Sequence, residues 1–241
     1  MLTPKERLIF ALDVSTVPEA RRLVELLQGE VGMFKVGLEL FVAAGPQFCR
    51  ELTAATGAAF FLDLKFHDIP ATVRAALENL SPGVRLTTLH CDQGAGLRAA
   101  TAAARARGVQ MLGVTVLTSL DAADLLAAGI DRRYVEPPTE LVLLRAALAQ
   151  AAGCAGVVCA AGEARAVKAR FGPDFLVVCP GIRPAWTVVS ADDQKRITTP
   201  AQAIRAGADY LVVGRPIRQA SDPVAAARRV VAEINAAAAG P

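Results

Sequence analysis

The chain has 241 residues, of which 53% are hydrophobic and 5% aromatic, and its formal net charge is +3. This composition excludes a disordered chain, and the small net charge argues against nucleic acid as a partner. Two histidines exclude a His-rich metal centre. A length of roughly 250 residues is typical of one α/β barrel, so we expect residues 1–241 to form a single domain.

The five cysteines predict a protein of a reducing compartment. Their number is odd and none forms a C-x-x-C pair, so we expect free thiols and a cytoplasmic location. The N-terminus carries charge within its first six residues, unlike a signal or transit peptide. The longest uncharged run, residues 146–162, is mostly alanine and contains Gln150, Gly153 and Gly156, so we expect no membrane span.

Short apolar runs recur along the chain and predict eight strands. They are continuous in Val, Ile, Leu and Phe, as expected where both faces of a parallel sheet are covered. The predicted strands are residues 8–12, 33–36, 60–65, 86–90, 111–117, 155–159, 175–179 and 210–214.

Alanine-rich amphipathic segments alternate with these strands and predict helices, several with proline in the first turn. Eight such alternations predict a (β/α)8 TIM barrel, whose active site lies at the C-terminal ends of the strands. The longest stretches without a predicted element are residues 131–138 and 183–199. The predicted helices are residues 18–28, 46–56, 69–80, 96–107, 139–152, 162–170, 200–206 and 223–236.

The segment of residues 60–70 places charged side chains at the end of a buried strand. Because side chains alternate along a strand, Asp63 and Lys65 should share one face, with Lys35 ending the preceding strand beside them. Two interpretations remain open from the residues alone. The charges form an ion-pair cluster that stabilises the barrel rim, or they form an electrostatic catalyst in which Lys65 delivers a proton.

Asp68 follows three residues after Lys65, in the turn where Ile69 and Pro70 are predicted to begin a helix. An aspartate at this position can act as the helix N-cap. It can instead project across a subunit interface, and the local sequence does not decide between these roles.

Seven segments of the chain stand out, namely FALDV, FKVGLEL, DLKFHDIPAT, VTVLTS, PGIRP, DQKRI and ADYLVVGRPI. Together these segments resemble the orotidine 5′-phosphate decarboxylase family. They run in order from the first predicted strand to the last and so cover nearly the whole chain. The resemblance implies a homodimeric barrel that converts orotidine 5′-monophosphate to UMP and CO₂ without a metal or other cofactor, in the last step of de novo UMP synthesis.

The resemblance also implies roles for individual residues. Lys65 protonates C6 of the pyrimidine, Asp63 lies near the departing carboxylate, and Lys35 and Asp68 complete the charge array. Asp68, together with Thr72, is contributed by the neighbouring subunit. The residues implied in substrate binding are Asp13, Lys35, Asp63, Leu64, Lys65, Phe66, His67, Asp68, Ile69, Pro70, Ala71, Thr72, Thr118, Arg183, Gln194, Gly214 and Arg215.

Asp13 is expected to contact the ribose hydroxyls, since a carboxylate accepts their hydrogen bonds. Gly214 and Arg215 follow the last strand, where barrels commonly bind phosphate, and Arg183 and Gln194 flank a charged loop on the same side. Thr118 is expected to bind the pyrimidine amide edge. Without the resemblance, Thr118 is equally suited to capping the next helix.

Two other enzyme patterns are weaker. Residues 94–99 match a dinucleotide fingerprint, but the acidic residue expected further on is missing, so we interpret them as a loop and helix start. A metal-stabilised enediolate reaction on a sugar phosphate would need another acidic ligand near Lys35, and Glu39 is available. A non-catalytic nucleotide-binding barrel would be expected to lack one of the four charged residues, and all four are present.

Three aromatic or imidazole side chains are expected to be structural. His90 ends a predicted strand and should pack at the rim, and His67 should face away from Asp68. Residues 184–189 are bulkier than the small polar lid expected from the resemblance. Trp186 among them should pack against the barrel rim, and the alternative is that it stabilises the closed lid.

Overall fold

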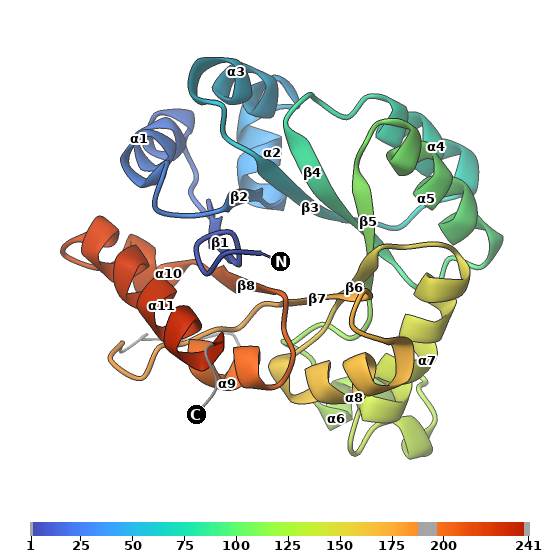
Figure 1. Ribbon diagram of the computed structural model, residues 1–241. Coiled ribbons are helices and arrows are strands. Elements are labelled where there is room, and N and C mark those ends of the chain that lie inside the picture. The colour runs from blue at the N-terminus through green and yellow to red at the C-terminus, as the bar shows by residue number, and fades with distance from the viewer. Residues whose placement is uncertain (1, 188–196, 239–241) are drawn as a thin grey trace.

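The computed structural model describes residues 2–187 and 197–238. Within them, eight parallel strands close into a barrel in sequence order, with β8 pairing back to β1 (Figure 1). The predicted (β/α)8 class is therefore confirmed. The strands are β1 Leu8–Ala11, β2 Met33–Val36, β3 Phe60–Phe66, β4 Val84–His90, β5 Gln110–Val114, β6 Gly156–Val158, β7 Leu176–Cys179 and β8 Tyr210–Val213.

Helices surround the barrel on its outer side (Figure 1). They bury the apolar outer faces of the strands, which explains why the strand sequences are almost continuously hydrophobic. The helices are α1 Val17–Leu27, α2 Leu38–Ala44, α3 Gln47–Thr56, α4 Pro70–Glu78, α5 Ala95–Ala106, α6 Ala122–Ala127, α7 Thr139–Ala151, α8 Ala161–Phe171, α9 Pro200–Arg205, α10 Arg215–Arg218 and α11 Pro223–Ala238.

The sequence did not predict α2, α6 or α10. All three are short, between four and seven residues, so their apolar periodicity is too brief to distinguish them from loops. The start of α6 nevertheless carries a capping box between Asp121 and Asp124, which uses aspartate where glutamate or glutamine is usual. The strands predicted over residues 111–117 and 210–214 end earlier, at Val114 and Val213.

Side-chain alternation divides the core into two layers. One layer fills the barrel interior and the other lies between the strands and the helices. On β3, Leu62 belongs to the outer layer, and Leu64 and Phe66 pack against it, as the alternation predicts. The interior layer consists of Ile9, Ala11, Met33, Phe61, Leu86, Leu112, Val178, Tyr210 and Val212.

Three charged side chains extend the interior face of their strands by one further step of the two-residue alternation. Asp13 follows Ala11, Lys35 follows Met33, and Asp63 follows Phe61, each two positions further toward the strand end. The barrel interior is therefore apolar below and charged above. This change occurs at the end where the catalytic residues of such barrels lie.

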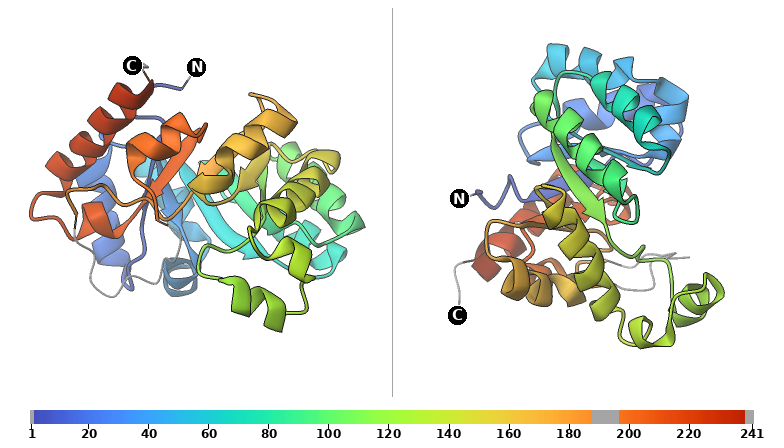
Figure 2. Two further views of the ribbon diagram at one scale, coloured as in Figure 1. Left: turned by 90° about the horizontal axis from the view of Figure 1, so that it is seen from below. Right: turned by 90° about the vertical axis from the view of Figure 1, so that its right-hand side faces the viewer.

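The two ends of the barrel are closed differently. Leu2 packs against the interior layer, so the N-terminal segment covers the end where the strands begin. Helix α6 stands out at the opposite end (Figure 2).

All five cysteines are free and buried, and burial raises the pKa of Cys49 to about 12. Among the described residues, no helix is long and apolar enough to cross a bilayer.

Candidate active site

A cavity of about 620 Å³ opens at the ends of the strands. Apolar side chains form its lower part, among them Phe61, Val114 and Val212. Eight of the residues that the sequence singled out line it: Asp13, Lys35, Asp63, Lys65, Thr118, Arg183, Gly214 and Arg215.

Lys35 and Asp13 form the first ion pair of the cavity. Lys35 Nζ lies 2.8 Å from Asp13 Oδ1, and the lysine is buried while the aspartate is half exposed. Because Ala11 pairs with Lys35 in the β1–β2 register, the aspartate two residues beyond Ala11 comes within reach of the lysine. Gly37 leaves room for this pair, since a Cβ atom there would lie 3.0 Å from Lys35 Nζ.

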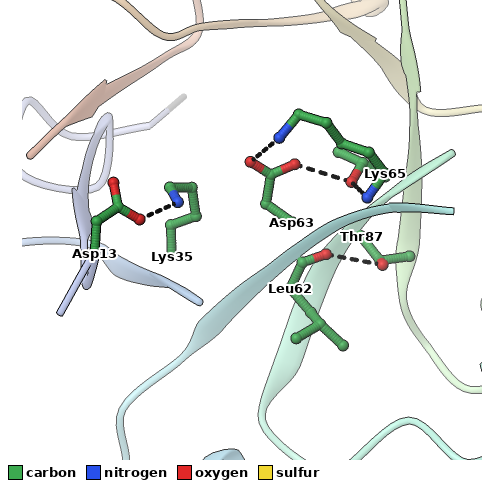
Figure 3. A network of polar contacts seen from close by, with 7 residues as sticks. Asp13, Lys35, Leu62, Asp63, Lys65 and Thr87 are labelled. Atoms are coloured by element: carbon green, nitrogen blue, oxygen red, sulfur yellow. Dashed lines mark hydrogen bonds and ion pairs between the residues drawn. The ribbon is translucent and has the colours of Figure 1, made fainter. Parts of the chain in front are cut away.

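Asp63 and Lys65 form the second ion pair, 2.8 Å between Oδ2 and Nζ (Figure 3). The Asp63 side chain is 12% exposed and that of Lys65 is 32% exposed. The prediction that the two share the cavity is confirmed, but simple alternation is not the whole reason. Lys65 has φ of +49°, and the pairing of β3 with β4 shifts register between Leu62 and Phe66.

Arginine side chains supply the positive charge on the other side of the cavity. Arg183 and Arg215 line it as predicted, and Arg218 lines it as well, which the sequence analysis missed. Arg215 begins α10 directly after β8, and Gly214 is the N-cap residue. Residue Gln194 lies outside the described residues.

Thr118 is buried and lines the cavity together with Ser119. The alternative prediction, that Thr118 caps the following helix, is wrong. Asp121 is the N-cap of α6, and its side chain accepts a hydrogen bond from the backbone N–H of Asp124. The cap of α6 is thus supplied by an aspartate three residues further along the chain, and Thr118 lines the cavity.

Asp68 does not line the cavity of its own chain, and of the two roles that the sequence left open, the N-cap of α4 is the wrong one. Ile69 is the N-cap residue, because Pro70 occupies the first helical position. Asp68 Oδ1 instead accepts the backbone N–H of Ile69 at 2.6 Å. Residues 67–72 are all exposed, so His67, Ile69, Pro70, Ala71 and Thr72 also lie away from this cavity, whereas Leu64 and Phe66 lie in the outer core layer.

Comparison with known proteins identifies the family of the chain. The model of the orotidine 5′-phosphate decarboxylase / HUMPS family matches residues 6–230. The chain belongs to this family.

Relatives are similar over nearly the full length of the chain. A protein of Desulfosudis oleivorans named orotidine 5′-phosphate decarboxylase is 51% identical over 236 residues, covering 97% of this chain and 95% of the relative. One from Anaeromyxobacter sp. with the same name is 47% identical, covering 96% and 99%. The crystal structure of the Lactobacillus acidophilus orotidine 5′-phosphate decarboxylase is 35% identical, with a TM-score of 0.78 over 95% of this chain and 98% of that chain.

The structure adds Thr88, a polar residue next to Asp63 and Lys65 that was not singled out in the sequence. It is fully buried on β4, two residues after Leu86 of the interior layer. Its hydroxyl donates a hydrogen bond of 3.0 Å to Asp63 Oδ1 and accepts one of 2.9 Å from the backbone N–H of Lys65. Alternation along β4 would have identified it as an interior polar residue beside the charges of β3.

The three side chains that were expected to be structural do not line the cavity. His90 is half-buried, its ring centroid lies 5.3 Å from that of His67, and burial lowers the pKa of His90. His67 Nε2 lies 3.7 Å from Asp92. Trp186 packs onto α11, where its Nε1 donates to Glu233 at 2.5 Å and the Arg229 guanidinium lies 4.5 Å from its ring.

The two weaker sequence patterns find little support in the side chains. Glu39 lines the cavity, but its Oε1 accepts a hydrogen bond from Ser15 at 2.6 Å. Residues 2–187 and 197–238 contain no cluster of three His, Cys, Asp or Glu side chains suited to a metal ion. Gly94 is the N-cap of α5 and Gly96 lies inside this helix, and neither lines the cavity.

Proposed function

We propose that this chain converts orotidine 5′-monophosphate to UMP and CO₂ in the last step of UMP synthesis, with Lys65 as the proton donor to C6. It is thus a carboxy-lyase, the activity named in its full-length relatives. The observation that carries the mechanistic part is the ion pair of Asp63 and Lys65, 2.8 Å apart at the end of β3 and inside the cavity.

The chemistry requires strong stabilisation of negative charge at carbon. When the bond from C6 to the carboxylate breaks, CO₂ leaves and the electron pair stays on C6 as a carbanion with little resonance relief. Fixed charges act strongly in a pocket that excludes water, and their contribution is often the largest single part of catalysis. The ammonium of Lys65 stabilises the carbanion and then transfers a proton to C6, which leaves a neutral amine and a new C–H bond.

Asp63 holds Lys65 in place through its Oδ2. In the substrate complex, the same carboxylate lies near the departing carboxylate, and repulsion between the two like charges is relieved when CO₂ leaves. Lys35 sits beside them, held by Asp13. This alternation of acid and base keeps the net charge of the array small while it places a cation at C6.

The rest of the nucleotide is held by residues around the same cavity. Asp13 is half exposed and accepts hydrogen bonds from the ribose hydroxyls. Arg215 binds the 5′-phosphate at the end of β8, together with the backbone at Gly214, and Arg183 lines the same cavity. Gln194, which lies outside the described residues, is proposed to complete the phosphate side. Thr118 binds the amide edge of the pyrimidine.

We further infer a homodimer in which Asp68, together with Thr72, completes the site of the neighbouring subunit. The run of exposed residues 67–72 supports this proposal, because it includes the large apolar side chain of Ile69, which is 66% exposed. Leu38 and Val42 of the adjacent β2–α2 unit are also exposed. Exposed apolar side chains of this kind are typical of interfaces. A cytoplasmic location and one domain over residues 1–241 complete the proposal.

The reaction is proposed to need no metal ion or organic cofactor. The decisive experiment follows the absorbance of orotidine 5′-monophosphate with enzyme purified and assayed in excess EDTA. We expect the same rate with and without the chelator. If the protein were inert until a divalent cation was added, the charge array would not be the catalyst, and the sugar-phosphate reaction through an enediolate would become the better proposal.

A further inference from the structure

We propose that Thr88 is a positioning residue that fixes the geometry of both Asp63 and Lys65. Its side-chain oxygen lies 3.0 Å from Asp63 Oδ1 and 2.9 Å from the backbone nitrogen of Lys65. The inference rests on the proposed function, because it assigns Thr88 an effect on the two side chains that perform the reaction. Thr88 itself does not line the cavity.

The register of β3 and β4 explains why Thr88 reaches both partners. Leu62 pairs with Thr87, and the next pairing is Phe66 with Leu89. Three residues of β3, Asp63 to Lys65, therefore lie opposite the single residue Thr88. Strand β3 bulges at this point, and its backbone cannot follow the regular ladder of hydrogen bonds.

The Thr88 hydroxyl takes the place of the missing ladder partner. The backbone N–H of Lys65 donates a hydrogen bond of 2.9 Å to this side-chain oxygen of β4. Lys65 has φ of +49°, a conformation that residues other than glycine, asparagine and aspartate seldom adopt. A specific hydrogen bond to its backbone N–H therefore stabilises an otherwise unfavourable backbone conformation.

The directions of the hydrogen bonds are fixed by chemistry. An ionised carboxylate can only accept, so the hydroxyl proton of Thr88 points to Asp63. The oxygen lone pairs are then available to the N–H of Lys65. With the bond from Lys65 Nζ to Asp63 Oδ2, the contacts form a closed ring, in which each oxygen of Asp63 has its own partner.

Burial makes this hydroxyl difficult to replace. Thr88 is 0% exposed. Valine has nearly the shape of threonine, so Thr88→Val removes the two hydrogen bonds with little change in packing. The Asp63 carboxylate then loses the partner that sets its rotation, and the Lys65 backbone loses its acceptor. Both changes move the lysine amine relative to C6.

The preceding residue offers a matched control. Thr87 is also 0% exposed, and its hydroxyl donates one buried hydrogen bond of 2.9 Å to the carbonyl oxygen of Leu62 (Figure 3). Because neighbouring side chains on a strand point to opposite faces, Thr87→Val removes a buried bond without touching Asp63 or Lys65. The two variants thus separate a general loss of stability from a loss of geometry at the site.

The experiment compares the parent protein with Thr88→Val, Thr88→Ser and Thr87→Val. The measurements are kcat and KM for orotidine 5′-monophosphate, the Kd for UMP, and the Tm. For Thr88→Val we expect kcat to fall roughly tenfold to hundredfold, the effect of losing one hydrogen bond to a charged group. KM and the Kd for UMP should stay within about threefold, because only the transition state carries negative charge at C6. Thr88→Ser keeps the hydroxyl and should restore kcat to within about threefold of the parent.

The Tm of the control, Thr87→Val, should fall by about as much as that of Thr88→Val, because each variant loses buried hydrogen bonding. Its kcat should nevertheless stay within about threefold of the parent's. A Thr88→Val enzyme with parental kcat would overturn the inference, and so would an equal loss of kcat in Thr87→Val. A failure of Thr88→Ser to restore kcat would also overturn it. If the parent protein itself does not decarboxylate orotidine 5′-monophosphate, the proposed function is wrong, and that result is distinct from any difference among the variants.

Discussion

The side chain of Lys65 returns to the carboxylate of Asp63, only two positions earlier in the chain, with 2.8 Å between Nζ and Oδ2. It does so from a backbone with φ of +49°, the one non-glycine residue with positive φ among residues 2–187 and 197–238. Strained backbone of this kind persists only where the surroundings hold it, and it is frequent at functional sites. Here the strain coincides with the proposed proton donor.

The strain at Lys65 predicts that glycine and alanine at this position lower the activity alike but differ in stability. Lys65→Ala and Lys65→Gly should both lose at least roughly 10³-fold in kcat, because each removes the proton donor and the cation beside C6. Lys65→Gly should unfold with a free energy roughly 1 kcal/mol higher than Lys65→Ala, because only glycine adopts this φ without steric cost. Urea unfolding and the decarboxylation assay measure the two quantities. Turnover within tenfold of the parent in either variant would contradict the role of Lys65.

Gly37 lies where any side chain would touch the Lys35–Asp13 pair. A Cβ atom there would be 3.0 Å from Lys35 Nζ and 3.4 Å from Asp13 Oδ1, while φ of −95° is open to any residue. Gly37→Ala should therefore displace the flexible amine rather than the backbone. We expect kcat to fall roughly tenfold and the free energy of unfolding to change by less than about 1 kcal/mol.

Gly162→Ala is the control for that substitution, since a Cβ at residue 162 meets nothing within 4 Å and lies on α8. It should leave kcat unchanged. If Gly37→Ala kept the parental kcat, the position of Lys35 would not be critical to the reaction.

Arg215→Ala tests the assignment of the phosphate site. Loss of a bidentate partner should raise KM for orotidine 5′-monophosphate roughly tenfold to hundredfold. The slow turnover of the nucleoside orotidine, which carries no phosphate, should remain unchanged. Arg98→Ala, on the exposed side of α5 and away from the cavity, serves as the control for removing one positive charge. A loss confined to the unphosphorylated nucleoside would contradict the assignment.

A site shared between subunits predicts complementation. Lys65→Ala and Asp68→Asn should each be inactive as homodimers. In a dimer of one chain of each kind, one site carries both substitutions and the other carries neither. After co-refolding of equal amounts, half of the dimers are mixed and each has one intact site, so about a quarter of the parental activity should return. Activity that stays at the level of the separate variants would place Asp68 outside the neighbouring site.

Local sequence patterns determined the barrel and the composition of its charged end. Apolar runs separated by amphipathic segments are sufficient to predict eight strand–helix units, because each pattern depends on neighbours within the same segment. The two-residue period also predicted that Asp63 and Lys65 share one face and that Leu62, Leu64 and Phe66 face the other way, and the side chains lie accordingly. The short helices α2, α6 and α10 were missed because so few residues carry no clear period.

Only the tertiary structure decided how these side chains meet. The opposition of three residues of β3 to Thr88, the positive φ of Lys65 and the pairing of Lys35 with Asp13 depend on register between separate strands. Arg218 joined the cavity for the same reason, as the closing of the barrel brings the end of β8 beside β1. The period along one strand determines which side chains share a face, but which residues of the next strand lie opposite them depends on packing between segments far apart in the chain.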